Sequence, residues 1–191
     1  MPVPGKRLVT AIRAYGPFFG PGVWQMVPPR RVVSSTGGTN GRDDLAMYDA
    51  VLIPTDGSAG TDTVLDHGLE FAKRYDATVH ALYVVDQRQY LGAEDDVQAD
   101  MSDDLHAEGD HAVAVAAERA TDAGLDVETA VVEGIPDKDI VDYVETNRID
   151  AVVIGRHARS SRDQVARLGS VTERVVKNAP VPVLVINLGD A

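Results

Sequence analysis

The sequence predicts an α/β protein in which helices cover both faces of a doubly wound parallel β-sheet. From Tyr48 onward, short apolar runs of four to eight residues alternate with longer amphipathic runs, which is typical of β-α-β units. Hydrophobic residues make up 44% of the 191 residues, enough for the core of one domain with an appendage. No apolar stretch approaches the roughly 20 residues that cross a bilayer, so we expect no membrane partner.

The first predicted strand, residues 50–53, ends at Pro54. The helix after it begins near Ser58 or Thr61, where the period of the apolar residues changes. One face of this helix carries Val64, Leu65, Gly68, Leu69, Ala72 and Tyr75. The second strand, 79–85, is almost continuously apolar and is therefore predicted at the centre of the sheet.

Residues 94–110 contain eight acids and no Lys or Arg. We interpret them as a solvated loop that enters the second helix, rather than as a metal site. His106 and His111 are five residues apart, which does not place them on one helical face as a pair of metal ligands. The helix continues over 112–123 and ends at Gly124.

The third strand, 127–132, has more polar positions and is predicted at an edge of the sheet. Pro136 opens the next helix, whose buried side carries Ile140 and Val144. The apolar run 151–154 is the fourth predicted strand.

The last helix opens at Gly169 and Ser170, with Val171, Val175 and Val176 predicted to point inward. The fifth strand, 181–186, contains Pro182, which favours an edge position because proline has no N–H for the ladder. A long apolar edge needs a cover, and pairing with a second copy along 181–187 is the simplest one. We therefore expect a homodimer.

The charged residues are 22 Asp and 8 Glu against 14 Arg and 4 Lys, which resembles the composition of proteins from extreme halophiles. The net charge of -12 argues against a nucleic-acid partner, because an acidic surface repels phosphates. The absence of cysteine excludes disulfides, thiol nucleophiles and Cys-ligated metals.

Residues 1–46 differ from the rest in charge and in composition. They hold six Lys and Arg against two Asp, a charge of +4, and are rich in Pro and Gly, so the remainder carries -16. The apolar residues of this segment follow neither the period of a strand nor that of a helix, and the segment lacks the apolar core of a signal peptide. We expect a dispensable, irregular and disordered extension before a cytoplasmic domain that comprises residues 47–191.

The ligand site is predicted at the carboxyl ends of the strands, where the strand order of an open parallel sheet reverses. Asp56 follows the first strand, and its carboxylate can accept hydrogen bonds from ribose hydroxyls or a base amine. Gly155 follows the fourth strand and lets the backbone approach a ligand. Gly169 and Ser170 start a helix whose free N–H groups suit an anion.

Charge supports this placement independently. Between Gly155 and Arg174 lie five arginines against two acids, a local charge of +3 within the acidic domain. These arginines are Arg156, Arg159, Arg162, Arg167 and Arg174. Beside glycines and a helix N-terminus, this charge favours phosphate binding over a merely solvated loop.

The same segments resemble the universal stress protein family. They are residues 47–58 (MYDAVLIPTDGS), 83–86 (YVVD), 155–158 (GRHA), 169–176 (GSVTERVV) and 179–185 (APVPVLV). The resemblance implies a five-stranded sheet of order 3-2-1-4-5, like that of the adenine nucleotide alpha hydrolases, and dimers along strand five. In one branch of the family it implies ATP binding without strong catalysis, and it leaves open whether Mg²⁺ accompanies the nucleotide.

The ATP-binding branch has the motif G-x2-G-x9-G-[ST], from which this sequence departs twice. Ala158 stands at the second glycine, and ten residues separate it from Gly169. Carried over residue by residue, the resemblance places Pro54, Thr55 and Asp56 near the adenosine and Val84 on the base. It places Ile154, Gly155, Ala158, Gly169, Ser170 and Val171 around the ribose and phosphates.

Three functions follow, and the sequence leaves them open. The first is an ATP-binding dimer that acts in the stress response as a sensor or scaffold. The second is the same fold without nucleotide, working through protein contacts, which Ala158 and the longer loop favour. The third is an enzyme, for which His157 with Ser160 or Ser161 is the nearby candidate pair. We expect no enzyme, although weak ATPase activity stays compatible with the first function.

Overall fold

The computed structural model describes residues 47–58, 60–92, 94–156 and 169–188. Five parallel strands form one sheet in the order β3-β2-β1-β4-β5. The strands are β1 (Ala50–Thr55), β2 (Thr78–Asp86), β3 (Val127–Gly134), β4 (Ala151–Arg156) and β5 (Val183–Asn187). Both the predicted fold class and the strand order are confirmed.

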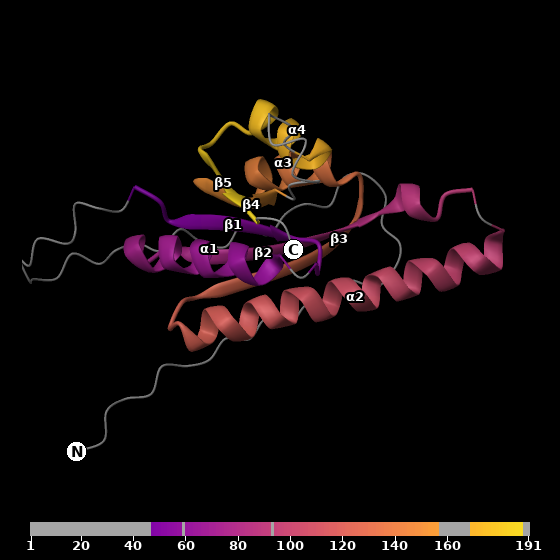
Figure 1. Cartoon of the computed structure of the whole chain (residues 1–191), viewed down its shortest axis with the longest axis horizontal. Coiled ribbons are helices and arrows are strands. Elements are labelled where there is room, and N and C mark those ends of the chain that lie inside the picture. The colour runs from indigo at the N-terminus through magenta and orange to yellow at the C-terminus, as the bar shows by residue number, and fades with distance from the viewer. Residues whose placement is uncertain (1–46, 59, 93, 157–168, 189–191) are drawn as a thin grey trace, which may run out of the picture.

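Helices cover both faces of the sheet, with α1 (Thr61–Tyr75) and α2 (Asp95–Asp122) on one face and α3 (Pro136–Thr146) and α4 (Ser170–Asn178) on the other (Figure 1). A short 3₁₀ helix, η1 (Gln87–Gln89), follows β2. Alternate strand residues face opposite layers, since Val51 and Ile53 join the cluster of α1 and α2 while Leu52 joins that of α3 and α4. The central strands are thus buried on both faces, as their apolar sequences predict.

The prediction of a loop over 94–110 is wrong, because α2 already begins at Asp95 and runs for 28 residues. The prediction gave more weight to the acidic residues than to the helical pattern, which begins further along the chain. There Gly109, Ala112, Val113 and Ala116 are buried. Acidic residues at a helix start also favour the helix, since they complement the positive end of its dipole. The predicted stop is confirmed: Gly124 has φ 78° and its N–H donates to the Thr121 carbonyl.

Two smaller predictions near the C-terminus are also wrong. Val176 is 40% exposed, and Thr172 is the buried residue of α4 beside Val175. β5 begins at Val183, so Pro182 lies before the strand, where its carbonyl accepts a hydrogen bond from the Val152 N–H. The edge position of β5 is confirmed nevertheless.

The extension 1–46 and the segment 157–168 lie outside the described residues, and so do Ala158, His157 and the two serines after it. Within the described part of the chain, none of the helices combines the length and apolar character needed to cross a membrane.

Candidate functional site

The carboxyl ends of β1 and β4 lie side by side where the sheet reverses its order, because β1 pairs with β2 on one side and with β4 on the other. After β1 the chain continues into α1 on one face of the sheet, and after β4 it continues into α4 on the other face. In open parallel sheets this divergence leaves a crevice for a ligand. The structure therefore brings the two predicted halves of the site to one place.

Thr55 and Asp56 shape the turn between β1 and α1. The Thr55 side chain is buried, its hydroxyl lies 3.2 Å from the Thr61 hydroxyl, and it accepts a hydrogen bond from the Gly57 N–H. Asp56 is exposed, and its Oδ1 accepts from the Ser58 N–H at 3.0 Å. Gly57 has φ 70°, a conformation that glycine adopts at no steric cost. Thr55 thus holds the turn, and Asp56 presents the carboxylate to solvent.

Gly155 has a packing role in addition to the ligand contact that the sequence predicts. A Cβ added there would lie 2.8 Å from Val64 Cγ2 and 3.1 Å from Leu188 Cδ1, so the missing side chain lets β4 pack against α1. The Gly155 carbonyl accepts a hydrogen bond of 2.8 Å from the hydroxyl of Thr172, which is 5% exposed. This bond fixes the first turn of α4 to the end of β4.

The first turn of α4 is the predicted phosphate site. Gly169 precedes the helix and is exposed, as is Ser170, while Val171 is half-buried against the core under α3 and α4. A Cβ on Gly169 would meet no heavy atom of the described residues within 4 Å. The first N–H groups of a helix have no carbonyl partner within the helix, so they suit an anion.

Val84 and Ile154 both face the layer of α3 and α4. Val84 is half-buried, whereas Ile154 is 5% exposed and belongs to the core. Pro54 is half-buried and lies opposite Leu82 of β2. The apolar surface that could meet a base is therefore that of Val84 and Pro54, and the Ile154 side chain packs inside the protein.

Two of the five arginines counted in the basic segment have protein partners. Arg174 pairs with Asp137 at the start of α3, with 3.2 Å between nitrogen and oxygen, and the Arg156 Nε donates to the Asn187 side-chain oxygen. The other three lie outside the described residues. Arg174 thus ties α4 to α3 in this structure instead of facing the crevice alone.

Sequence reasoning missed Glu108. This carboxylate of α2 reaches the β1 turn, because a Cβ on Gly57 would lie 3.3 Å from its Oε1. Burial raises the pKa of Tyr83, and the charges of Glu108 and then Asp56 raise it further. Two carboxylates therefore flank the phenol at the end of β2. A reading of 94–110 as helix would have placed Glu108 four residues before the buried Ala112 and so on the side of the helix that faces the sheet.

A second missed feature follows β2. Arg88 of η1 donates to both carboxylate oxygens of Asp86, at 2.7 and 2.6 Å. The hydrogen bond from Arg88 lowers the pKa of Asp86. This pair fixes the chain where it leaves the sheet beside Val84.

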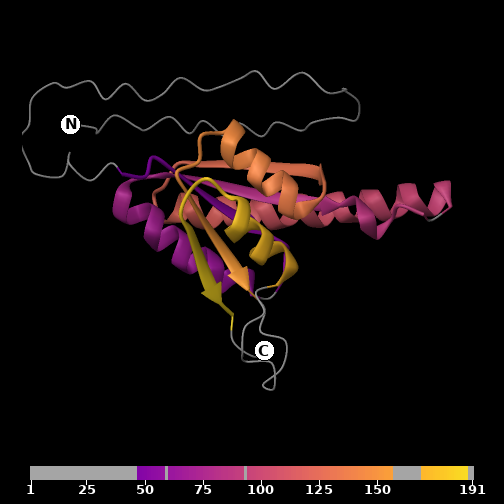
Figure 2. The same ribbon diagram turned by 90° about the horizontal axis from the view of Figure 1, so that it is seen from above.

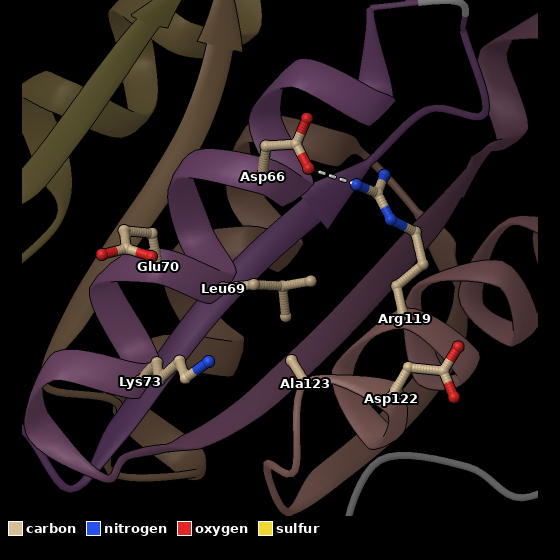
Figure 3. A pocket seen from close by; sticks show the side chains of 7 residues that line it. All are labelled: Asp66, Leu69, Glu70, Lys73, Arg119, Asp122 and Ala123. Carbon is tan, nitrogen blue, oxygen red and sulfur yellow. Dashed lines mark hydrogen bonds and ion pairs between the residues drawn. The ribbon is translucent and has the colours of Figure 1, made fainter.

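A surface groove of about 340 Å³ lies elsewhere, between α1 and α2 (Figure 3). Its lining residues are Asp66, Leu69, Glu70, Lys73, Arg119, Asp122 and Ala123. Arg119 crosses it to pair with Asp66, and also pairs with Asp62 at 2.9 Å. None of the predicted site residues lines this groove. Across the ranges that the structure describes, no cluster of three or more His, Asp or Glu could hold a metal.

Comparison with known proteins now decides the family. The model of the universal stress protein family matches residues 47–187. The chain belongs to the universal stress protein family. Universal stress protein MJ0531 of Methanocaldococcus jannaschii is 36% identical over 141 residues, which cover 73% of this chain and 82% of that protein.

Solved structures of universal stress proteins share the fold. That of MJ0577, from the same organism, has a TM-score of 0.66 at 29% identity and covers 76% of this chain and 99% of its own. Two others, each at 22% identity and a TM-score of 0.54, are complexes: one with cAMP, and one from Archaeoglobus fulgidus with dAMP. They cover 74% and 73% of this chain and 98% of their own, and at this identity they support the fold alone.

Proposed function

We propose that this universal stress protein binds ATP in the crevice between the carboxyl ends of β1 and β4. The observation that carries the proposal is the hydrogen bond from Thr172 to the Gly155 carbonyl, which holds the first turn of α4 beside that crevice. An anion-binding helix start and an exposed carboxylate on the neighbouring turn then face one ligand that carries phosphates and hydroxyls.

Different residues bind different parts of the ligand in this proposal. The N–H groups of Ser170 and Val171, with Gly169 before them, bind the phosphates, and Asp56 accepts hydrogen bonds from the ribose. Val84 and Pro54, which are both apolar and half-buried, pack against the base. Ala158, which lies outside the described residues, completes the phosphate loop in this proposal.

The protein acts as a sensor or scaffold in the stress response rather than as an enzyme. Catalysis of hydrolysis needs a positioned nucleophile or base, and the carboxylates near the crevice, Asp56 and Glu108, are both exposed. ATP therefore acts as a ligand that changes the surface, and hydrolysis is slow at most. We place the protein in the cytoplasm.

We further propose a homodimer that pairs along residues 181–187. β5 is an edge strand, and Leu184 on it is 43% exposed. Val176 of the neighbouring α4 is 40% exposed. An apolar edge strand is a template for pairing, so a second copy would cover it. Sedimentation equilibrium should give the dimer mass, and Leu184→Lys should give the monomer mass without unfolding; a monomeric wild type ends this part of the proposal.

A second function is the same fold without nucleotide, acting through protein contacts. The substitution of the motif glycine by Ala158 and the ten-residue spacing to Gly169 favour it. If the motif position needs a positive φ, alanine there costs roughly 1 kcal/mol.

ATP titration separates the two functions. In isothermal titration at high salt, the wild type should bind ATP, and Asp56→Ala should weaken binding by removing the ribose acceptor. Asp66→Ala is the matched control, because Asp66 is also an exposed carboxylate but lies in the α1–α2 groove. Absence of binding at millimolar ATP refutes the nucleotide proposal. Equal effects of the two variants refute the role of Asp56.

We also infer that the domain comprises residues 47–191 and that 1–46 lie outside it. The family model matches residues 47–187, and the strands and helices of the described residues lie within that range. A chain that begins at Met47 should therefore unfold at the same denaturant concentration as the full chain and bind ATP equally well. Loss of solubility or of binding in the shorter chain contradicts this division.

A further inference from the structure

Helix α2 is longer than the sheet it covers. Its 28 residues span about 42 Å at 1.5 Å per residue, and Figure 2 shows it continuing past the ends of the strands. From Val97 onward, the first buried residue of α2 is Gly109. Residues 97–104, which we name the α2 arm, therefore leave the domain without a core of their own.

The α2 arm combines exposed apolar residues with acids. Val97 and Met101, one helical turn apart, are 46% and 37% exposed, and Leu91 just before the helix is 58% exposed. Asp100 and Asp104 follow Val97 and Met101 by three residues, so each lies beside one of them on the helix surface. Asp103 is exposed as well. The surface is apolar at its centre and negative around it.

The root of the arm is held to the sheet. Tyr90 is 3% exposed and packs with the half-buried Leu105 in one cluster, and the His106 Nε2 lies 4.0 Å from the Glu133 carboxylate of β3. Helices of two or three turns are marginal in water unless packing stabilises them. A partner that covers the apolar residues of the arm would supply that packing.

We propose that the α2 arm is the docking site of the chain's own residues 1–46. The sequence of this segment complements the arm in charge, with six bases against two acids, and it supplies aromatic anchors. It contains Trp24, the single tryptophan of the protein, and both Phe18 and Phe19. An aromatic side chain covers Met101 and Val97, and arginines on either side of it pair with Asp100 and Asp104.

The chain is long enough, and a weak contact suffices. Trp24 is 23 residues from Met47, and a chain of that length spans at most roughly 80 Å, which exceeds the length of α2. A tethered segment acts at an effective concentration of about 1 mM, so a contact with a Kd of about 0.1 mM is occupied about nine-tenths of the time. The arm lies outside the sheet core, so docking there leaves folding and ATP binding independent of residues 1–46.

Trp24 fluorescence of the full chain tests the docking directly, because no other tryptophan contributes. The reference is the synthetic peptide of residues 1–46. We expect emission at shorter wavelength and weaker quenching by acrylamide in the protein than in the peptide. The double variant Val97→Ser and Met101→Ser should return both values to those of the peptide. Val176→Ser is the matched control, with the same substitution at a 40% exposed helix position of α4.

Each other outcome overturns the proposal. Emission of the wild type equal to that of the peptide means that the arm has another occupant. Protected emission that survives the double variant means that residues 1–46 dock elsewhere. Protection that disappears on dilution means that the occupant comes from a second copy. Circular dichroism checks that the double variant and the control variant are folded. If the double variant is unstable, the single variant Met101→Ser should give an intermediate shift of the emission wavelength.

Discussion

The hydrogen bond between Thr172 and Gly155 allows the most direct test of how α4 is placed. Thr172→Val keeps the shape of the side chain and removes the donor. The bond is 2.8 Å long and its donor is 5% exposed, so its loss should cost about 1 kcal/mol, and about 2 kcal/mol if the carbonyl is left unsatisfied. For a domain of this size, each 1 kcal/mol lowers Tm by about 2–4 °C.

Urea unfolding of three variants isolates the bond. Thr172→Ser keeps the hydroxyl and should recover most of the loss. Thr146→Val is the matched control, because its hydroxyl also donates to a carbonyl at 2.8 Å, that of Asp142, but on an exposed helix surface. We expect that control to stay within about 0.5 kcal/mol of the wild type. Equal stability of Thr172→Val and the wild type refutes the anchor.

The same variant connects the anchor to the proposed ligand. If bound ATP requires the α4 turn in place, the free energy lost from the anchor appears as weaker binding, up to about tenfold for 1.4 kcal/mol. Unchanged ATP affinity in a destabilised Thr172→Val protein shows that the bond serves folding alone.

Three further predictions concern packing and pH. Gly155→Ala should destabilise the protein by about 1–3 kcal/mol in urea unfolding, because its Cβ would lie 2.8 Å from Val64 Cγ2; an unchanged midpoint contradicts this packing role. Tyr143→Phe should lower the free energy of unfolding by about 1–3 kcal/mol, since the Tyr143 hydroxyl shares a 3.1 Å hydrogen bond with Nδ1 of His80, which is 5% exposed. If the stability does not change, this bond makes no net contribution. Burial lowers the pKa of His80, and the nearby charge of Glu128 opposes that shift in part. The unfolded chain therefore binds the proton more readily than the folded protein does. The free energy of unfolding should fall as pH drops below about 6.5 and level off below the pKa of the folded protein. His80→Gln should reduce that slope in unfolding midpoints measured from pH 7.5 to 5, and an identical slope contradicts the assignment.

Much of the sheet could be predicted from the sequence, because the physics that sets it is local. Runs such as 151–154 are apolar on both faces, which fits strands covered by two layers of helices. Gly124 has the positive φ that its position after a helix predicts.

The wrong predictions concern residues whose burial depends on contacts with residues distant in the sequence. Thr172 was overlooked on α4 because it is polar, yet its hydroxyl has an acceptor, so burial costs little. Val176 was predicted inward for being apolar and is exposed. Gly155 also packs against Val64 of α1, a contact that the sequence near Gly155 cannot reveal. Glu108 reaches the turn after β1 only because α2 is helical from Asp95 onward.

Titration of the ¹⁵N-labelled full chain with ATP tests the proposed site most directly, because each backbone amide reports its own surroundings. We predict saturable shifts that gather at Asp56 and Gly57, at Val84, and at Ser170 and Val171. The crevice between β1 and β4 is then the nucleotide site. Shifts that gather in the α1–α2 groove around Lys73, or no shifts at millimolar ATP, contradict it.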